Sequence, residues 1–496
     1  MIFDWTDFEA CRNRIASRSY QVCVAGGGPA GITIARALER KGHTVALFEG
    51  GGEEPRAESQ AVYQGEIIGQ SYFPLNVTRL RFLGGSSNHW NGWCRPLDDV
   101  DFERRTYHPY SGWPISKQDL DPFAPETEEI LELPAHSPPG GNPFEADGSL
   151  QTVRFRWSRP PVRFGGKYRE DLETSDEIDV FLNANVMGLP LDSAGARVRG
   201  FRISGFDEDT ELEVPASLYA LCMGGLENPR LLLNAVEDRP NGLGNGSGNV
   251  GRFFSEHPHF TIAHLQPRRT LTTELTNFAP TQEFMQEDRI LNFNLRLPAT
   301  DRRARFSVRS MAFLCGGPFR EWLGSLLLGQ DLDCDRPWDL GFPVRIASEQ
   351  GLEPESRVKL GTDVDAFGLR RIRLDWRVGD LTFRTMRSAA LELGRVATER
   401  GLGRVRVQDW LLEDRVTLPP VGEDEVGGHH HMCTTRMSSS PRSGVVDRNC
   451  RLHEVPNLFV GGSSTFASGG YANPTFTIIQ LCLRLAKHLS AELKRR

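Results

Sequence analysis

The sequence has no long apolar run, and this absence bounds where the protein can work. None of its apolar stretches approaches the roughly 18 residues that a membrane-spanning helix needs. The first 20 residues alternate acidic and basic side chains without an apolar centre, so we expect no secretory signal peptide. These two absences predict a cytoplasmic protein without a membrane span.

The sequence also has no concentration of charge or of paired cysteines. Its 58 basic and 65 acidic residues give a net charge of -7, and neither sign forms a long block. This balance offers no electrostatic basis for binding nucleic acid or an anionic membrane surface. The 9 cysteines are scattered without CxxC spacing, which is typical of reduced thiols in a reducing compartment. We therefore expect a small-molecule partner.

One glycine-rich stretch, residues 20–49, has the order strand, turn, helix, strand and acid. The apolar run 21–25 leads into Gly-Gly-Gly-Pro-Ala-Gly at 26–31, and apolar residues at helical spacing follow. A second apolar run, 44–48, ends at Glu49. This is the order of a dinucleotide-binding βαβ unit.

The residue types in this unit have separate physical roles. Gly26 allows the tight turn, Gly28 lets the backbone approach a pyrophosphate, and Gly31 lets the helix pack close to the strand. Glu49 is placed to accept hydrogen bonds from a ribose. The alternative is a glycine turn that opens a core helix and binds nothing.

A second glycine-rich stretch lies at 78–93 and contains Gly-Gly-Ser-Ser-Asn-His-Trp at 84–90. Glycines, hydroxyls, an amide and a histidine make a poor helix or strand, but they suit backbone wrapped against a ring system. The alternative is a glycine-rich loop with a surface histidine.

These motifs together resemble the glucose-methanol-choline (GMC) family of flavin oxidoreductases. The loop at 84–90 is most similar to the pyranose oxidase branch and to bacterial sugar and polyol dehydrogenases. The resemblance implies that the βαβ unit binds FAD, not NAD, with Val186 at the adenine end. In pyranose oxidases the histidine in the position of His89 carries the flavin covalently, whereas other relatives have this histidine without the bond. The loop residues that the resemblance places along the isoalloxazine ring are Gly84, Gly85, Ser86, Asn88 and His89.

The C-terminal stretch contains a further, more specific motif. Residues 430–437, His-His-Met-Cys-Thr-Thr-Arg-Met, resemble the family signature of a histidine, two residues, Gly-Thr, one residue and Arg-Met. Cys433 stands where the family has glycine. Two later segments follow in family order and imply further cofactor contacts by Gly462, Ser463, Pro474 and Thr475.

His430 and Asn473 match the family's paired catalytic positions. A neutral imidazole accepts a proton near neutral pH, because its ordinary pKa is about 6.5. An amide donates to developing negative charge without titrating. The alternative is a satisfied buried histidine and a turn asparagine.

Other catalytic chemistries find less support. Three consecutive histidines invite a metal, but in a strand His429 and His431 would point away from His430, and no cluster with ligand spacing accompanies them. We expect no metal. No nucleophile-elbow context surrounds Cys433 or Ser463.

We expect an α/β fold with a discontinuous Rossmann-like FAD-binding domain at 1–105, 176–259 and 422–496. An α+β substrate-binding domain built on an antiparallel sheet is predicted at 106–175 and 260–421. The apolar segment 319–328 is either a core or dimer helix or an apolar lid at a substrate entrance. Strands are predicted at 178–186, 216–222, 290–297, 306–313, 356–360 and 372–376, and helices at 119–131 after Ser116 and at 383–399 before Gly401.

The resemblance implies an enzyme that oxidises a CH-OH group of a sugar, glycoside, polyol or other alcohol to a carbonyl. The mechanism would combine proton abstraction with hydride transfer to flavin N5, and oxygen, a quinone or another acceptor would reoxidise the flavin. One alternative is an NAD(P)H-dependent flavin monooxygenase, although Gly224-Gly225 lacks the full spacing of a second nucleotide-phosphate turn. The other alternative is a non-redox lyase on the same fold.

Overall fold

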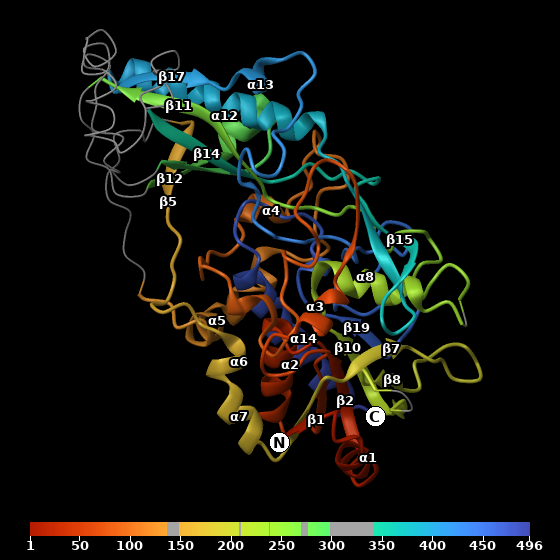
Figure 1. Cartoon of the computed structure of the whole chain (residues 1–496). Helices are drawn as coiled ribbons and strands as arrows, with labels where there is room; N and C mark the ends of the chain where they lie inside the picture. Colours follow the sequence, from red (N-terminus) through yellow and green to blue (C-terminus); the bar gives the residue numbers. More distant parts are fainter. Residues whose placement is uncertain (136–147, 208–209, 238, 269–275, 298–340) are drawn as a thin grey trace, which may run out of the picture.

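The computed structural model describes residues 1–135, 148–207, 210–237, 239–268, 276–297 and 341–496. A parallel sheet lies near the two chain termini, and an antiparallel sheet lies at the opposite end (Figure 1). This arrangement confirms the predicted mixed α/β class. The predicted strand at 306–313 and the apolar segment 319–328 lie outside the described residues.

The parallel sheet has six strands, and every neighbouring pair in it is parallel. Its central strands contain the buried apolar runs 22–25, 45–48 and 218–221, as a sheet covered on both faces requires. The predicted βαβ unit is confirmed, because helix α2 (Pro29–Glu39) connects the second and third strands of the chain. In spatial order the strands are β1 (Ile2–Asp4), β6 (Ile178–Leu182), β3 (Val45–Phe48), β2 (Tyr20–Ala25), β10 (Ala216–Leu221) and β19 (Leu458–Val460).

The strand order of this sheet reverses beside β2. From β2 the chain continues to β3 on one side, while β10 and β19 lie on the other side. Such a reversal leaves a crevice at the carboxyl ends of the strands, where α/β proteins bind ligands. The turns that leave β2, β10 and β19 all meet at this edge: Gly26 N donates to Phe48 O, and Gly461 N donates to Leu221 O.

The antiparallel sheet forms the second part of the fold. Helix α12 (Asp380–Glu399) packs against β11, β14 and β17, and it encloses a separate apolar core. The helix confirms the prediction at 383–399, and Gly401 follows it in the left-handed region at φ +63°. In spatial order the strands are β17 (Gly403–Val407), β11 (Pro258–Pro267), β14 (Phe342–Ser348), β13 (Phe293–Leu297), β12 (Thr276–Pro280) and β5 (Leu150–Val153), with β18 (Val426–Gly427) also paired to β11.

Two predicted strands belong to a different sheet from the one expected. β15 (Arg357–Val364) and β16 (Arg370–Trp376) form a three-stranded sheet with β4 (Gly65–Gly69), which runs parallel to β16. Alternating apolar residues identify a strand but not its partner, so the prediction of one antiparallel sheet was wrong here. A fourth sheet contains β7 (Asn185–Gly188), β8 (Phe201–Ser204) and β9 (Leu212–Val214).

Two predicted elements are interrupted. The helix predicted at 119–131 is confined to α5 (Ala124–Ile130), because Pro122 and Pro125 lack the backbone N–H that a continuous helix needs. Ser116 instead caps a short 3₁₀ turn at Lys117–Asp119. The strand predicted at 178–186 breaks at Asn183, whose φ of +53° ends β6 before β7 begins in another sheet.

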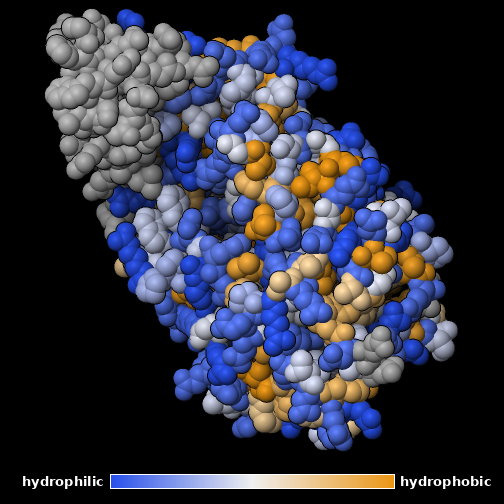
Figure 2. Space-filling view, in the orientation of Figure 1, coloured by the Kyte–Doolittle hydropathy of each residue, from blue (hydrophilic) through white to orange (hydrophobic). Residues whose placement is uncertain are grey.

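The predicted domain boundaries stay a prediction. β4 and β16 pair across them, as do β11 and β18. No helix in the described ranges combines the length and apolarity needed to cross a membrane. The visible face of the molecule mixes hydrophilic side chains with several separate apolar groups (Figure 2). The remaining helices are α1 (Phe8–Ala16), α3 (Ala57–Ala61), α4 (Asp99–Phe102), α6 (Phe164–Lys167), α7 (Arg169–Thr174), α8 (Gly224–Asn234), α9 (Gln282–Asp288), α13 (Asp409–Leu412) and α14 (Thr475–Leu493).

Candidate functional site

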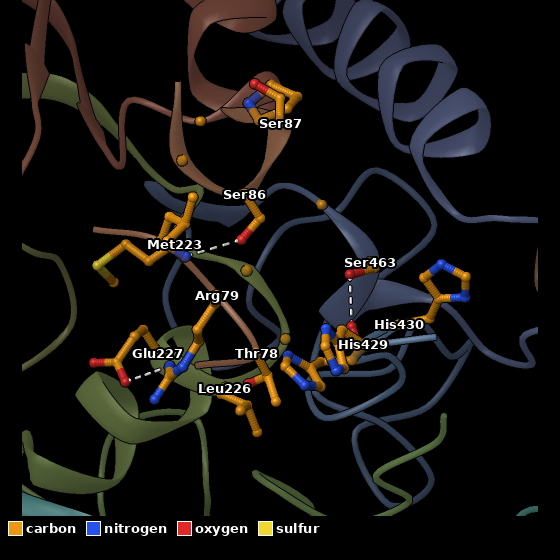
Figure 3. A pocket seen from close by; sticks show the side chains of 18 of the residues that line it. Thr78, Arg79, Ser86, Ser87, Met223, Leu226, Glu227, His429, His430 and Ser463 are labelled. Atoms are coloured by element: carbon orange, nitrogen blue, oxygen red, sulfur yellow. Dashed lines mark hydrogen bonds and ion pairs between the residues drawn. The ribbon is translucent and has the colours of Figure 1, made fainter. Parts of the chain in front are cut away.

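A cavity of about 720 Å³ begins at the carboxyl ends of the parallel strands and reaches the antiparallel sheet. Its volume lies within the roughly 300–1,000 Å³ that is usual for small-molecule and cofactor sites. Figure 3 shows Ser86, His430 and Ser463 around this space, with Arg79 and Glu227 beside them. The sequence-predicted residues that line the cavity are Gly26, Gly28, Glu49, Gly85, Ser86, His89, Val186, His430, Gly462, Ser463, Asn473, Pro474 and Thr475.

Three predicted cofactor residues do not border the cavity themselves, but they hold the backbone segments that do. At Gly31 a Cβ would lie 1.9 Å from Gly26 O, so only glycine lets α2 pack against the turn. Gly84 has φ +93°, and a Cβ there would lie 2.5 Å from the backbone nitrogen of Gly165. Asn88 Nδ2 donates to Leu83 O at 2.9 Å and holds the loop closed.

The residues at the parallel-sheet end fit a dinucleotide. Gly28 is the N-cap of α2, and a Cβ there would meet nothing within 4 Å, so space is open in front of the helix. α8 and α14 also begin at the cavity, at Gly224 and Thr475. Helix N-termini present free N–H groups and a partial positive charge, which suits a pyrophosphate.

Glu49 is held in place for contact with a ribose. Its Oε2 accepts from Gly27 N at 2.8 Å, and its Oε1 accepts from Gly51 N at 2.9 Å. A carboxylate has about four acceptor positions, so two remain for ribose hydroxyls. Arg81 ties the following turn by donating to Gly50 O at 2.7 Å. The residues present therefore fit FAD.

A buried ionic network borders the cavity, and no sequence motif predicted it. Arg79 Nη1 lies 2.6 Å from Glu227 Oε1, and Arg230 Nη1 lies 3.0 Å from Glu227 Oε2. Burial alone would raise the pKa of Glu227, but Arg230 and Arg79 lower it below its ordinary value. Arg230 also pairs with Asp365, so two guanidinium groups face two carboxylates and the network has no net charge. Arg79 and Glu227 are 148 positions apart, so no local pattern could have paired them.

A second histidine, His257, determines which nitrogen of His430 carries the proton. His257 Nε2 contacts Gly469 O at 3.3 Å and must donate, because a carbonyl only accepts. In the neutral ring, His257 Nδ1 is then an acceptor, and His430 Nδ1 donates to it at 2.8 Å. His430 Nε2 takes part in no hydrogen bond with a described residue, and the ring lines the cavity. His430 therefore carries a lone pair on Nε2.

Burial keeps His430 neutral. It lowers the pKa of His430 well below the ordinary value, and His257 and His259 lower it further. The pKa of His257 falls to about 3, again chiefly through burial. An uncharged imidazole with a free acceptor can take a proton near neutral pH. The Asn473 side chain also lines the cavity and has no hydrogen-bond partner among the described residues.

One carboxylate holds the two histidine segments together. Glu256 Oε1 accepts from His430 N at 2.7 Å and from His257 N at 2.8 Å, while Oε2 accepts from the Tyr72 hydroxyl. The Tyr72 oxygen also lies 3.0 Å from His431 Nε2. Burial raises the pKa of Glu256 to about 7. Sequence reasoning missed His257, Glu256 and Tyr72, because none of them belongs to a motif.

The three consecutive histidines do not lie in a strand. His429 has φ +58°, and the stretch runs as irregular backbone. His430 faces His257, whereas His431 is buried against Tyr72. Across the described residues, no group of three or more His, Cys, Asp or Glu side chains is arranged to hold a metal ion. The seven described cysteines are free and buried.

Comparisons with known protein families match the two ends of the chain. Residues 21–139 match a family described as FAD dependent oxidoreductase. Residues 353–482 match a family described as GMC oxidoreductase.

Individual relatives cover more of the chain. The large subunit of fructose dehydrogenase from Gluconobacter japonicus is 26% identical over 324 residues, which cover 63% of this chain and 54% of that protein. The chain thus spans about half the length of that relative. 2-methyl-1,2-propanediol dehydrogenase from Mycolicibacterium austroafricanum is 25% identical, with 95% of each protein covered. The crystal structure of pyridoxine 4-oxidase from Mesorbium loti shares the fold, with a TM-score of 0.57 and 16% identity over 95% of this chain and 99% of that one.

Proposed function

Because the chain belongs to the GMC family of FAD-dependent oxidoreductases, we propose that it oxidises a CH-OH group of a sugar, glycoside, polyol or related alcohol to a carbonyl. The observation that carries this proposal is the lone pair on His430 Nε2, in a cavity that also fits a dinucleotide. The names of a fructose dehydrogenase and of a propanediol dehydrogenase support a hydroxylated substrate.

Bound FAD supplies the acceptor for the hydride that leaves the substrate carbon. His430 Nε2 accepts the proton of the reacting hydroxyl, and the bond from His430 Nδ1–H to His257 holds the ring in that tautomer. Asn473 donates its amide N–H to the oxygen as negative charge develops on it. The His430 imidazole and the Asn473 amide are both uncharged before the reaction. The negative charge that develops on the substrate oxygen is therefore stabilised by a hydrogen-bond donor and is not repelled by a nearby anion.

His89 would contact the flavin from the 84–90 loop. Its side chain lines the cavity. Burial lowers the pKa of His89 below the ordinary value, and the positive charge of Arg163 lowers it further. A neutral imidazole is the form able to bond to a flavin carbon. Covalent attachment through His89 stays a prediction.

The proposal is tested by mixing the yellow, purified protein with alcohols in the absence of oxygen. A panel of sugars, polyols and secondary alcohols should bleach the flavin with at least one member, because hydride transfer reduces it. A lyase would turn over with its flavin still yellow, and a monooxygenase would be reduced by NAD(P)H instead. Either result, or a colourless protein, would overturn the proposal.

Two finer points belong to the same proposal. Oxygen, a quinone or another acceptor reoxidises the flavin, and an oxygen electrode beside a quinone-dye assay distinguishes them. A cytoplasmic location is expected, and cell fractionation tests it.

A further inference from the structure

Three neighbouring strands of the antiparallel sheet present one row of residues to the cavity. His259 on β11 and Asn294 on β13 both pair with Ala347 on β14, which lies between them. Residues directly opposite each other in an antiparallel sheet point to the same face. All three line the cavity. The small Ala347 side chain therefore leaves a hollow between two larger polar groups.

The polar groups on either side of this hollow each have one atom without a partner. His259 is 7% exposed; its Nδ1 lies 3.5 Å from Glu425 Oε1, and its Nε2 has no hydrogen bond to a described residue. Asn294 is 2% exposed, and its Nδ2 donates to Asn277 while its Oδ1 accepts from no described residue. Buried polar atoms are normally paired, so unpaired ones facing a cavity indicate a ligand.

A neutralised ion pair closes one side of the hollow. Arg296 Nη2 lies 2.9 Å from Glu425 Oε2, and both residues line the cavity. Burial opposes ionisation, yet His259, Arg296 and Arg345 lower the pKa of Glu425 to about 2. The Arg296 Nε has no partner among the residues that the structure describes. A carboxylate beside a guanidinium offers acceptors and donors without net charge, which suits neutral hydroxyl groups.

The hollow adjoins the catalytic histidine proposed above. The rings of His259 and His430 lie with their centroids 6.0 Å apart, at an interplanar angle of 84°. One small ring-shaped molecule can therefore reach both. Its reacting hydroxyl would lie at His430 and its other hydroxyls in the hollow.

We propose that His259, Asn294, Arg296 and Glu425 form a hydroxyl subsite that binds the non-reacting hydroxyl groups of a neutral carbohydrate ring over Ala347. This proposal rests on the proposed function and narrows its substrate class to polyhydroxylated rings, as opposed to monohydric alcohols. Such a ligand would supply partners for His259 Nε2, Asn294 Oδ1 and Arg296 Nε.

The test compares the holoenzyme with Glu425→Gln and Ala347→Leu. The first variant weakens the acceptor, and the second fills the hollow without removing a polar group. Glu423→Gln is the matched control, because Glu423 is exposed and only two residues from Glu425. Flavin absorbance and the unfolding temperature establish that each variant is folded and loaded.

Binding is measured without turnover. Glucose, galactose, fructose and xylose are titrated by calorimetry into holoenzyme that dithionite has already reduced. The sugar that binds best should bind about 10- to 100-fold more weakly to both variants, since each loses a hydrogen bond to a charged group or the room for the ring. Glu423→Gln should bind it unchanged. Cyclohexanol has a ring of similar size but no second hydroxyl, so Glu425→Gln should reduce its oxidation much less than it weakens sugar binding, whereas Ala347→Leu should reduce both and Glu423→Gln neither.

The outcomes separate this inference from the proposed function. If cyclohexanol bleaches the flavin but no sugar binds, or if both variants bind sugar normally, the hydroxyl subsite is refuted and the oxidase or dehydrogenase function stands. If sugar binding weakens as expected but no alcohol reduces the flavin, the hydroxyl subsite stands and the proposed function fails. In Glu425→Gln, equal losses for sugar and cyclohexanol would also refute the subsite, since they indicate general damage to the cavity.

Discussion

Replacing His257 with phenylalanine tests whether the hydrogen bond between the two histidines fixes the proton of His430. Phenylalanine keeps a ring of similar size next to His430, but it has no acceptor for His430 Nδ1–H. The 2.8 Å bond between the two Nδ1 atoms is then lost. His430 becomes free to carry its proton on Nε2, where it cannot act as a base.

The expected loss follows from the strength of that bond. A hydrogen bond between neutral groups contributes about 0.5–1.5 kcal/mol, which corresponds to roughly 2- to 13-fold in the population of the productive tautomer. Removing a general base altogether costs about 10²–10⁴-fold. His257→Phe should therefore slow flavin reduction much less than His430→Ala. Anaerobic stopped-flow spectroscopy resolves these two ranges.

His257→Asp provides the rescue. An aspartate accepts from His430 Nδ1–H and restores the tautomer, so reduction at high pH should recover toward the wild-type rate. Its negative charge also raises the pKa of His430. Because only neutral His430 is active, activity is present above that pKa and lost below it, and the acid limb should move to higher pH. Wild-type rates in His257→Phe, or no recovery in His257→Asp, would refute the tautomer argument.

Four further experiments test the remaining assignments. Gly28→Val should give a folded but colourless protein, because a side chain there meets open space in which a pyrophosphate would lie; absorbance and circular dichroism check both parts. Acid precipitation should yield a yellow pellet if His89 bonds the flavin, and His89→Ala should then release the colour into the supernatant. His430→Ala and Asn473→Ala should each slow reduction, and the double variant should lose less than the product, because both act on one oxygen. Because the pKa of Glu256 is raised to about 7, its protonated form stabilises the wild-type protein fully below about pH 4.5, and this stabilisation is lost as pH rises through about 7. The free energy of unfolding of the wild type, measured by denaturant titration, should therefore fall by about 3 kcal/mol between pH 4.5 and 7. Glu256→Gln should not show this fall, because glutamine does not titrate.

The sequence predicts this fold best where the interactions are local. β2, α2 and β3 follow one another within residues 20–48, and their glycine spacing and apolar periods suffice to identify them. Sheet membership in the second half depends on which distant strands pair. β4 and β16 are joined across about 300 positions, and no pattern in either strand names its partner.

In the candidate site, too, the sequence predicts residues in local motifs but not contacts between distant residues. His430 and Asn473 were identified through motifs, and the structure places both on one cavity. His257 lies 173 positions from His430, so the contact that orients the imidazole has no local signature. Asn88 looked like a cofactor ligand because of its neighbours, but its amide bonds Leu83 O within the loop. Residue type and spacing cannot distinguish a side chain that faces a ligand from one that holds the backbone.

The four-residue stretch 256–259 couples substrate fit to the chemistry of His430, two properties that separate segments would let vary independently. Glu256 accepts a hydrogen bond from the backbone N–H of His430, and His257 determines which ring nitrogen of His430 carries the proton. His259 faces the neighbouring hollow. Any shift of this stretch that changes which substrate fits the hollow will also move His257, the hydrogen-bond partner of His430. Directed evolution for a new substrate should therefore find that substitutions at His259 change the rate and pH dependence of the chemical step, whereas substitutions at Ala347, on another strand, change fit alone.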